Sequence, residues 1–131
     1  MTVPVDRTQR VLDNGNPVTP DHAEINPSTG QQKGYVVLTP EERSKGFVLP
    51  VRESYRHIKC GGVTTMSRAI AETYARDPHF YGGTFCCACR THFPLQIDGV
   101  WQFFWFVNGE EIPEAVGDYT PPDIPSPDAS V

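Results

Sequence analysis

The hydrophobic positions of this chain are concentrated in its middle. Over residues 1–34, single aliphatic residues stand among Pro, Gly, Asn, Asp, Thr and Gln, and no helical or strand period persists. We therefore predict an extended arm over residues 1–34. The periodic pattern begins at Tyr35 and predicts one domain over residues 35–112, and a Pro-rich tail follows over residues 113–131.

A short helix is predicted directly after the first β-prone run, which begins at Tyr35. The segment Thr39-Pro40-Glu41-Glu42 has an N-cap threonine, proline at the first helical position and glutamate three residues after the cap. Gly46 can end this helix after about two turns. Residues 47–58 then predict one or two β segments, interrupted by Pro50.

A longer helix is predicted over Thr65–Arg76, ended by Asp77-Pro78. Apolar side chains recur there at every fourth position: Met66, Ile70 and Tyr74. A charged stripe has the same spacing: Arg68, Glu72 and Arg76. We interpret that stripe as a solvent-exposed ion-pair face.

The C-terminal part of the domain predicts a three-stranded antiparallel meander over Phe93–Ile112. Asp98-Gly99 and Asn108-Gly109 are hairpin turn signals on either side of Val100–Val107. That central strand is apolar on both faces, with Gln102 as its only polar residue. Its second face must be covered by the helix, by an arm or by a partner, and the pattern leaves burial within the chain and a partner interface equally open.

Composition and charge separate the middle of the chain from its ends. All aromatic residues lie between Tyr35 and Tyr119, and nine of the 13 prolines lie outside residues 35–112. Basic and acidic residues balance within residues 35–112, so the net charge of −5 belongs to the ends. The chain lacks the basic excess that general binding to nucleic acid or anionic lipid requires.

The chain contains no apolar run of transmembrane length and no signal-peptide pattern at its N-terminus. We expect no membrane association and no secretion, which places the protein in a cytoplasm. In such a reducing compartment, four cysteines indicate metal ligands or free thiols rather than disulfides.

Two pairs of metal-ligand residues carry the candidate chemistry. His57 and Cys60 are separated by two residues, and so are Cys86 and Cys89. This spacing suits a metal knuckle, a tight turn that presents two side chains to one ion. Gly61 can adopt the positive φ of such a turn. Three thiols and an imidazole form a tetrahedral set suited to structural Zn²⁺, with a spacing similar to that of zinc ribbons.

Three other residues are candidate replacements for one of these ligands. Cys87 is adjacent to Cys86, His92 follows Cys89 at the same spacing, and His79 stands after the predicted helix. A catalytic zinc keeps a coordination position for water, which a closed set of three thiolates and one histidine does not leave. We therefore predict that the protein is not an enzyme, and a zinc hydrolase or deaminase ranks last.

Several segments together resemble a family of small, largely uncharacterised zinc-ribbon-like proteins encoded by tailed bacteriophages and prophages. The resemblance covers roughly residues 35–107. It rests on these segments: Val37–Arg43, Val51–His57, Cys60–Met66, Ala69–Arg76, Phe80–Cys86, and Cys89-Arg90 with His92-Phe93-Pro94. It implies a viral origin and a metal site at His57, Cys60, Cys86 and Cys89, and it implies no activity.

These observations predict a small α+β fold that is zinc-ribbon-like, with one principal helix between two metal knuckles and an antiparallel meander. We predict a non-enzymatic, protein-binding module of a bacteriophage, most concretely a minor virion or head-accessory protein in the host cytoplasm or the virion. Its partners would be other phage proteins. The alternative is a phage early protein that binds and inhibits or redirects a host factor. A nucleic-acid-binding zinc ribbon ranks third, resting on basic residues around the first knuckle: Arg43, Lys45, Arg52, Arg56 and Lys59.

Overall fold

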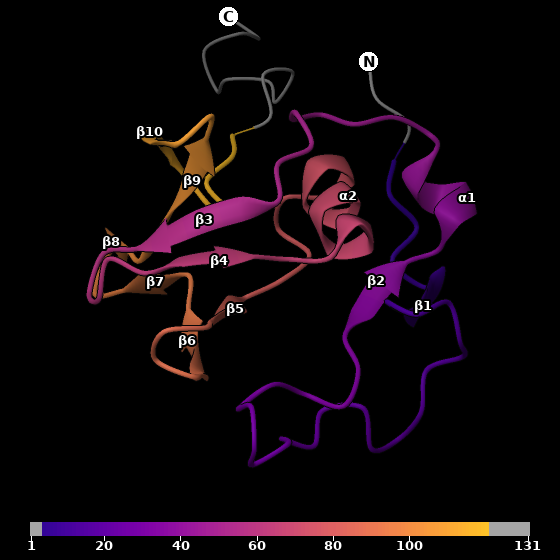
Figure 1. The fold of residues 1–131 in the computed structure, drawn as a ribbon. Helices are drawn as coiled ribbons and strands as arrows, with labels where there is room; N and C mark the ends of the chain where they lie inside the picture. The colour runs from indigo at the N-terminus through magenta and orange to yellow at the C-terminus, as the bar shows by residue number, and fades with distance from the viewer. Residues whose placement is uncertain (1–3, 121–131) are drawn as a thin grey trace, which may run out of the picture.

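The computed structural model describes residues 4–120, which form a small α+β structure with mostly antiparallel sheets and few helices (Figure 1). The two helices are α1 (Pro40–Arg43) and α2 (Arg68–Arg76). The strands are β1 (Arg10–Leu12), β2 (Val36–Leu38), β3 (Ser54–His57), β4 (Val63–Thr65), β5 (Gly83–Cys86), β6 (Thr91–Pro94), β7 (Gln96–Ile97), β8 (Val100–Trp101), β9 (Phe103–Val107) and β10 (Glu110–Ala115).

The largest sheet has four antiparallel strands in the order β10-β9-β3-β4, and three two-stranded ribbons surround it, β1-β2, β5-β6 and β7-β8. Helix α2 lies between the large sheet and the β1-β2 ribbon (Figure 1). The core is aromatic: the Trp105 ring makes edge-to-face contacts with Tyr55 and with Tyr74 of α2. Such pairs add stabilisation beyond the area that they bury.

Both predicted helices are present but shorter than expected; α1 begins at the predicted position, whereas α2 begins at Arg68, three residues after the predicted start at Thr65. The Thr39 side chain accepts a hydrogen bond from the Glu42 amide at the N-cap of α1, and the helix makes a single turn. Helix α2 is capped by Ser67, because residues up to Thr65 belong to strand β4. The local capping signal placed the start of α1 correctly, whereas the side-chain period that predicted α2 did not show that its first residues belong to a strand.

The predicted meander is divided at Gln102. Both hairpin turns are present, with Asp98 and Asn108 at positive φ, but β7-β8 is a separate ribbon and β9 pairs with β10 and β3. The break lies at the buried residue Gln102. Its backbone N–H donates to the Leu95 carbonyl at 2.9 Å, and its backbone carbonyl accepts from the Ile58 N–H at 3.0 Å. The chain therefore exchanges pairing partners at that residue.

The predicted solvent-exposed stripe on α2 needs a correction at its last member. Arg68 and Glu72 form the expected exposed pair at 3.3 Å, whereas Arg76 is only 1% exposed. The Arg76 guanidinium donates to the carboxylate of Glu42 at 3.1 Å, and both side chains are fully buried. The spacing within α2 could not predict the burial of Arg76, because α1 and the N-terminal segment (residues 4–34) cover that end of the helix.

The N-terminal segment differs from the predicted arm in how it is held. Strand β1 pairs with β2, Leu12 is buried, and Arg7 forms two hydrogen bonds to Asp77 at 2.6 and 2.9 Å. The expected boundary at residue 112 also shifts, because β10 continues to Ala115 and Val116 is in the core. Of the predicted tail, residues 121–131 lie outside the described part of the chain.

Substitution of Gly30 tests whether this segment is integral to the fold. Gly30 has φ +82°, and a Cβ atom there would lie 2.0 Å from the Arg90 carbonyl oxygen on the opposite loop. We expect Gly30→Ala to lower the free energy of unfolding by roughly 1–3 kcal/mol in urea titrations. Gly15→Ala is the control, because Gly15 has a similar φ of +90° and nothing near its Cβ position. Equal losses in both variants would mean that the contact with Arg90 contributes nothing.

Candidate metal centre

The first knuckle joins β3 to β4. The amide of Gly61 donates to the His57 carbonyl at 2.8 Å, and the His57 amide donates to the Gly62 carbonyl at 3.0 Å. Gly61 has φ +72°, as predicted for such a turn. The Gly62 amide lies 3.3 Å from the Cys60 sulfur, so the backbone of the turn positions this thiol beside the histidine.

The second knuckle joins β5 to β6, and backbone hydrogen bonds shape it as they shape the first. The Arg90 amide donates to the Cys86 carbonyl at 2.7 Å, and the Cys89 amide lies 3.4 Å from the Cys86 sulfur. Here Arg90 has the positive φ, at 59°. A conformation that favours glycine is therefore held by an arginine, whose side chain donates to the Ser28 carbonyl of the N-terminal segment.

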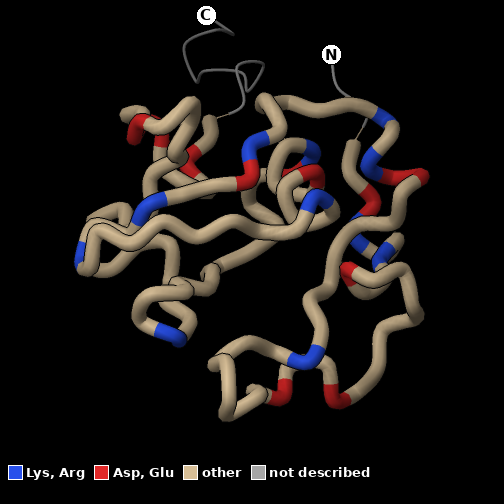
Figure 2. The backbone as a smooth tube through the Cα atoms, in the orientation of Figure 1, with Lys and Arg blue, Asp and Glu red and all other residues tan. Residues whose placement is uncertain are grey.

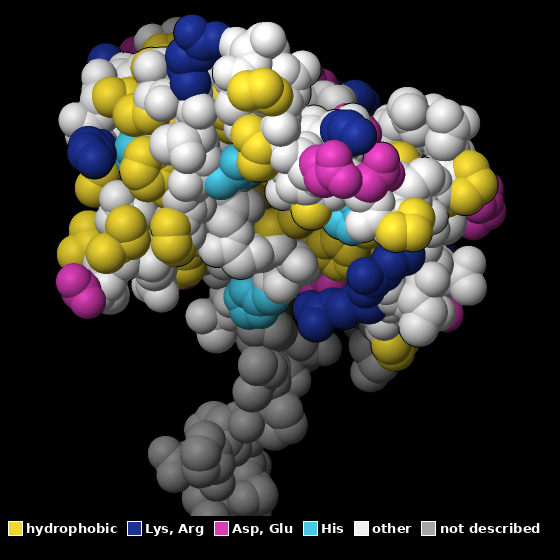
Figure 3. Space-filling view, turned by 90° about the horizontal axis from the view of Figure 1, so that it is seen from below, with side chains coloured by type: hydrophobic (Ala, Val, Ile, Leu, Met, Phe, Trp, Pro, Cys, Tyr) yellow, Lys and Arg dark blue, Asp and Glu magenta, His cyan; other side chains and the backbone are white. Residues whose placement is uncertain are grey.

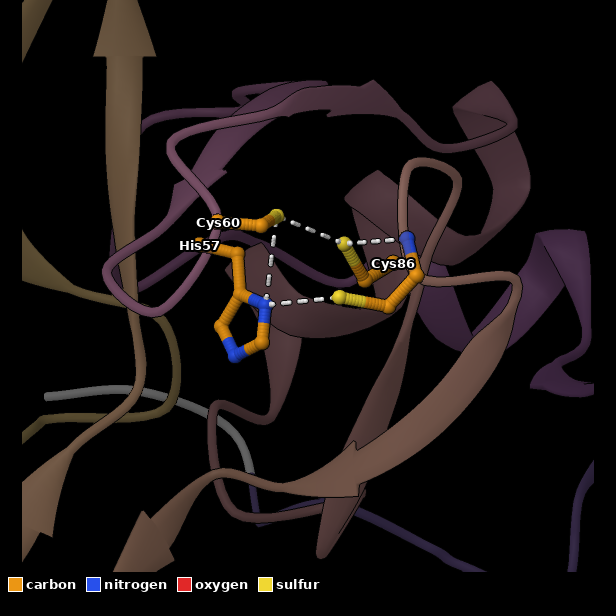
Figure 4. Close-up of side chains that lie close together, drawn as sticks. His57, Cys60 and Cys86 are labelled. Carbon is orange, nitrogen blue, oxygen red and sulfur yellow. Dashed lines mark hydrogen bonds between the residues drawn. The ribbon is translucent and has the colours of Figure 1, made fainter.

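The four predicted ligands, His57, Cys60, Cys86 and Cys89, lie together. One ligand atom from each falls within 4.8 Å of the others, so the group could hold a metal ion. Figure 4 shows the side chains of the two knuckles converging. All four cysteines of the chain are free thiols.

Three separations between ligand atoms can be compared with those of a tetrahedral metal site. If the ion were zinc, with Zn–S near 2.3 Å and Zn–N near 2.0 Å, two sulfurs would lie about 3.8 Å apart and a sulfur and a nitrogen about 3.5 Å apart. The Cys60 and Cys86 sulfurs are 3.5 Å apart. The His57 Nδ1 atom lies 3.6 Å from the Cys60 sulfur and 3.7 Å from the Cys89 sulfur. Three of the six separations thus have the lengths of a tetrahedral site, and all six are within 4.8 Å, so the group could hold a metal ion.

His57 is buried against two aromatic rings. Its ring centroid lies 4.5 Å from that of Phe93 and 4.6 Å from that of Phe103, and the residue is 1% exposed. This burial lowers the pKa of His57, and the charge of Lys59 lowers it further. Both effects favour the neutral imidazole, which is the form that binds a metal, and its Nδ1 atom faces the thiols.

The thiols differ in how readily they ionise. The Gly62 N–H lowers the pKa of Cys60 by stabilising its thiolate. Removal from water raises the pKa of Cys89 to about 11, and its hydrogen bonds to the other two thiols act in the same direction. A divalent cation among the sulfurs would reverse this effect, because metal binding requires thiolates.

The candidate replacement ligands lie outside the cluster. The Cys87 thiol is exposed and lies 3.2 Å from the Val63 carbonyl oxygen. The Nε2 atom of His92 is 2.8 Å from the Tyr35 hydroxyl. His79 is exposed, with its ring 6.2 Å from that of Tyr119.

Sequence reasoning missed how closely the knuckles pack. A Cβ atom at Gly62 would lie 2.6 Å from the Cβ atom of Ala88, so the two turns meet at two small residues. The Cys87 amide also donates to the Thr64 hydroxyl at 2.9 Å, which ties the second knuckle to β4. The doubled glycine after Cys60 was the available signal, because only the first glycine is needed for the turn itself.

Fold and site together define a small α+β protein with a His/Cys cluster that could hold a metal ion. In comparisons with protein-family models, curated proteins and solved structures, no match was found. Among the described residues, neither helix has the length and apolar character needed to cross a membrane.

Proposed function

We propose that this chain is a zinc-ribbon-like, non-enzymatic binding module of a bacteriophage, with a structural Zn²⁺ held by His57, Cys60, Cys86 and Cys89. The observation that carries the proposal is the convergence of four ligand atoms within 4.8 Å. Three thiolates and one imidazole saturate a tetrahedral ion and leave no position for a reacting water. A metal in this set acts by holding two distant turns together.

The proposed contact surface surrounds the metal knuckles. Among residues 4–120, four of the seven exposed large hydrophobic residues lie on the first knuckle, at the start of β4 and on the β7-β8 ribbon: Ile58, Val63, Ile97 and Val100. Hydrophobic side chains are numerous on this side of the molecule (Figure 3). Exposed aliphatic residues in one region are typical of protein–protein contacts.

Two cations accompany this surface. The Arg56 guanidinium lies 6.0 Å from the Phe106 ring centroid, and the Lys59 ammonium lies 5.5 Å from that of Phe93. Neither cation forms an ion pair with any residue between 4 and 120. The surface therefore suits a protein partner that offers apolar and acidic side chains.

Charge favours a protein over nucleic acid as the partner. Basic and acidic residues are interspersed along the described backbone (Figure 2). Nucleic acid would require several cations aligned to neutralise phosphates. A virion role rests on the phage resemblance, and mass spectrometry of purified particles tests it. Absence of the chain from particles would refute a virion role and favour the early protein that binds a host factor.

Ile58→Glu tests the contact surface. Ile58 is 47% exposed beside the metal site, so a glutamate there should leave the fold intact and place a charge in the contact. We expect about 5- to 30-fold fewer copies per purified particle, measured by quantitative mass spectrometry. Ile25→Glu is the matched control, since Ile25 is 52% exposed on the N-terminal segment. Equal incorporation of the two variants would contradict the proposed surface.

A further inference from the structure

A cavity of about 700 Å³ lies between the N-terminal segment and the elements β4, α2 and β5. The face seen in Figure 3 is hollowed between these two walls, with histidine and basic side chains around the hollow. Sites for small molecules usually enclose about 300–1,000 Å³, so this cavity has the size of a ligand site. Neither the metal cluster nor the proposed contact surface uses it.

Hydrogen bonds between its two walls hold the cavity open in a fixed shape. The Tyr81 hydroxyl donates to the Val36 carbonyl at 2.6 Å. The Tyr35 hydroxyl lies 2.8 Å from the Nε2 atom of His92. These bonds occupy the hydroxyl groups and fix the rings, so a bound molecule would meet aromatic rings that are already ordered.

The lining is aromatic and polar at the same time. Four aromatic residues, Tyr35, Phe80, Tyr81 and Phe85, line the cavity together with Gln31 and Gln32. Aromatic rings accept a planar ring by stacking, and amide groups can bond both donors and acceptors on its edge. A purely aliphatic ligand would leave these polar groups unsatisfied.

Two polar groups of the lining have bonding capacity to spare. The buried Nδ1 atom of His22 has no hydrogen-bond partner among the residues that the structure describes. Arg10 donates from Nε to the Arg7 carbonyl at 2.7 Å and lies 5.6 Å from the Phe80 ring centroid. It forms no ion pair within residues 4–120, whereas Arg7 is neutralised by Asp77.

We propose that this cavity binds a nucleoside monophosphate. Its base would stack on the aromatic lining with its edge bonded to the glutamine amides, and its phosphate would pair with the guanidinium of Arg10, which forms no ion pair within residues 4–120. The charge of Arg10 suits a ligand with one anionic group. Asp13 is the only carboxylate among the described lining residues, and it already accepts a hydrogen bond from the Tyr35 amide at 3.2 Å. This site shares no residues with the proposed partner surface, so an experiment can refute one proposal and leave the other standing.

Calorimetric titration of the zinc-loaded full chain tests the site. The probes are the four 5′-ribonucleoside monophosphates, the matching nucleosides and ribose 5-phosphate at constant ionic strength. We expect at least one nucleotide to bind with a Kd below about 1 mM. The matching nucleoside should bind at least tenfold more weakly, and ribose 5-phosphate should not bind. Absence of binding by all four nucleotides, or tighter binding of ribose 5-phosphate than of any nucleotide, would overturn the proposal.

Arg10→Gln tests whether Arg10 binds the phosphate group of the nucleotide, and Arg56→Gln is its matched control. Both arginines are exposed, donate from Nε to a backbone carbonyl and lie over a phenylalanine ring, but Arg56 is outside the cavity. We expect Arg10→Gln to weaken nucleotide binding at least tenfold while leaving nucleoside binding and the melting curve unchanged. Arg56→Gln should bind as the natural chain does. Equal weakening by the two substitutions would overturn the assignment of Arg10.

Discussion

Cys60→Ser is expected to abolish stoichiometric zinc binding and to unfold the domain. Cys60 is exposed and lies outside the hydrophobic core, so its substitution removes a ligand without disturbing packing. Structural zinc contributes on the order of 10 kcal/mol of apparent binding free energy that is available only to the folded chain. Since whole domains are typically stable by about 5–15 kcal/mol, losing this term should leave the chain largely unfolded at 25 °C.

Metal analysis and circular dichroism of the same samples measure this effect. The natural chain should carry about one zinc and lose its cooperative melting transition on treatment with a chelator, matching Cys60→Ser. Cys87→Ser is the control, because Cys87 is also an exposed thiol, adjacent to a ligand but outside the cluster. A Cys60→Ser protein with one zinc and an unchanged melting curve would contradict the assignment, as would loss of zinc from Cys87→Ser.

The candidate site was predictable because each half of it is local. A two-residue separation between ligands, with glycine in the turn, describes a knuckle without reference to the rest of the chain. What the sequence could not provide is the surroundings of the site. The aromatic rings packed against His57 come from β6 and β9, 36 and 46 residues farther along the chain. Their positions depend on how the strands pair, which no local pattern encodes.

The same limit explains the errors in the fold. The period of α2 placed Tyr74 on the buried face, which the structure confirms, but it also placed Arg76 in solvent. A helix that is covered from two sides has no single exposed face, and the second cover comes from α1 and the N-terminal segment. That segment has few apolar residues. It is attached through backbone pairing and through Leu12, which composition alone cannot distinguish from a free arm.

The buried pair of Glu42 and Arg76 carries the second large expected effect. The Glu42 carboxylate accepts hydrogen bonds from Lys45, the Asp6 amide and Arg76 at 2.9, 3.0 and 3.1 Å. Arg76 also donates to the Pro4 carbonyl at 3.2 Å. We expect Glu42→Gln to lower the free energy of unfolding by about 3–5 kcal/mol, because the fully buried guanidinium would lose its counter-charge.

Urea titrations of Glu42→Gln and of Glu41→Gln measure this contribution. Glu41 is the exposed neighbour on the same helical turn, so its substitution should change stability by less than about 0.5 kcal/mol. Similar losses in the two variants would contradict a special role for the buried carboxylate. The double variant Glu42→Gln/Arg76→Met removes the stranded charge and should recover part of the stability lost by Glu42→Gln alone.

The pH dependence of the difference between the natural chain and Glu42→Gln gives an independent check. Hydrogen bonds from Lys45, the Asp6 amide and Arg76 lower the pKa of Glu42 from its usual 4.5 to about 2. A carboxylate with a lowered pKa stabilises the fold fully above the unfolded value and loses that effect as pH falls through the folded value. The stability difference should therefore be constant above about pH 5 and should narrow between about pH 4.5 and pH 2. A difference that stays constant down to pH 2 would show that its origin is packing rather than the charge of Glu42.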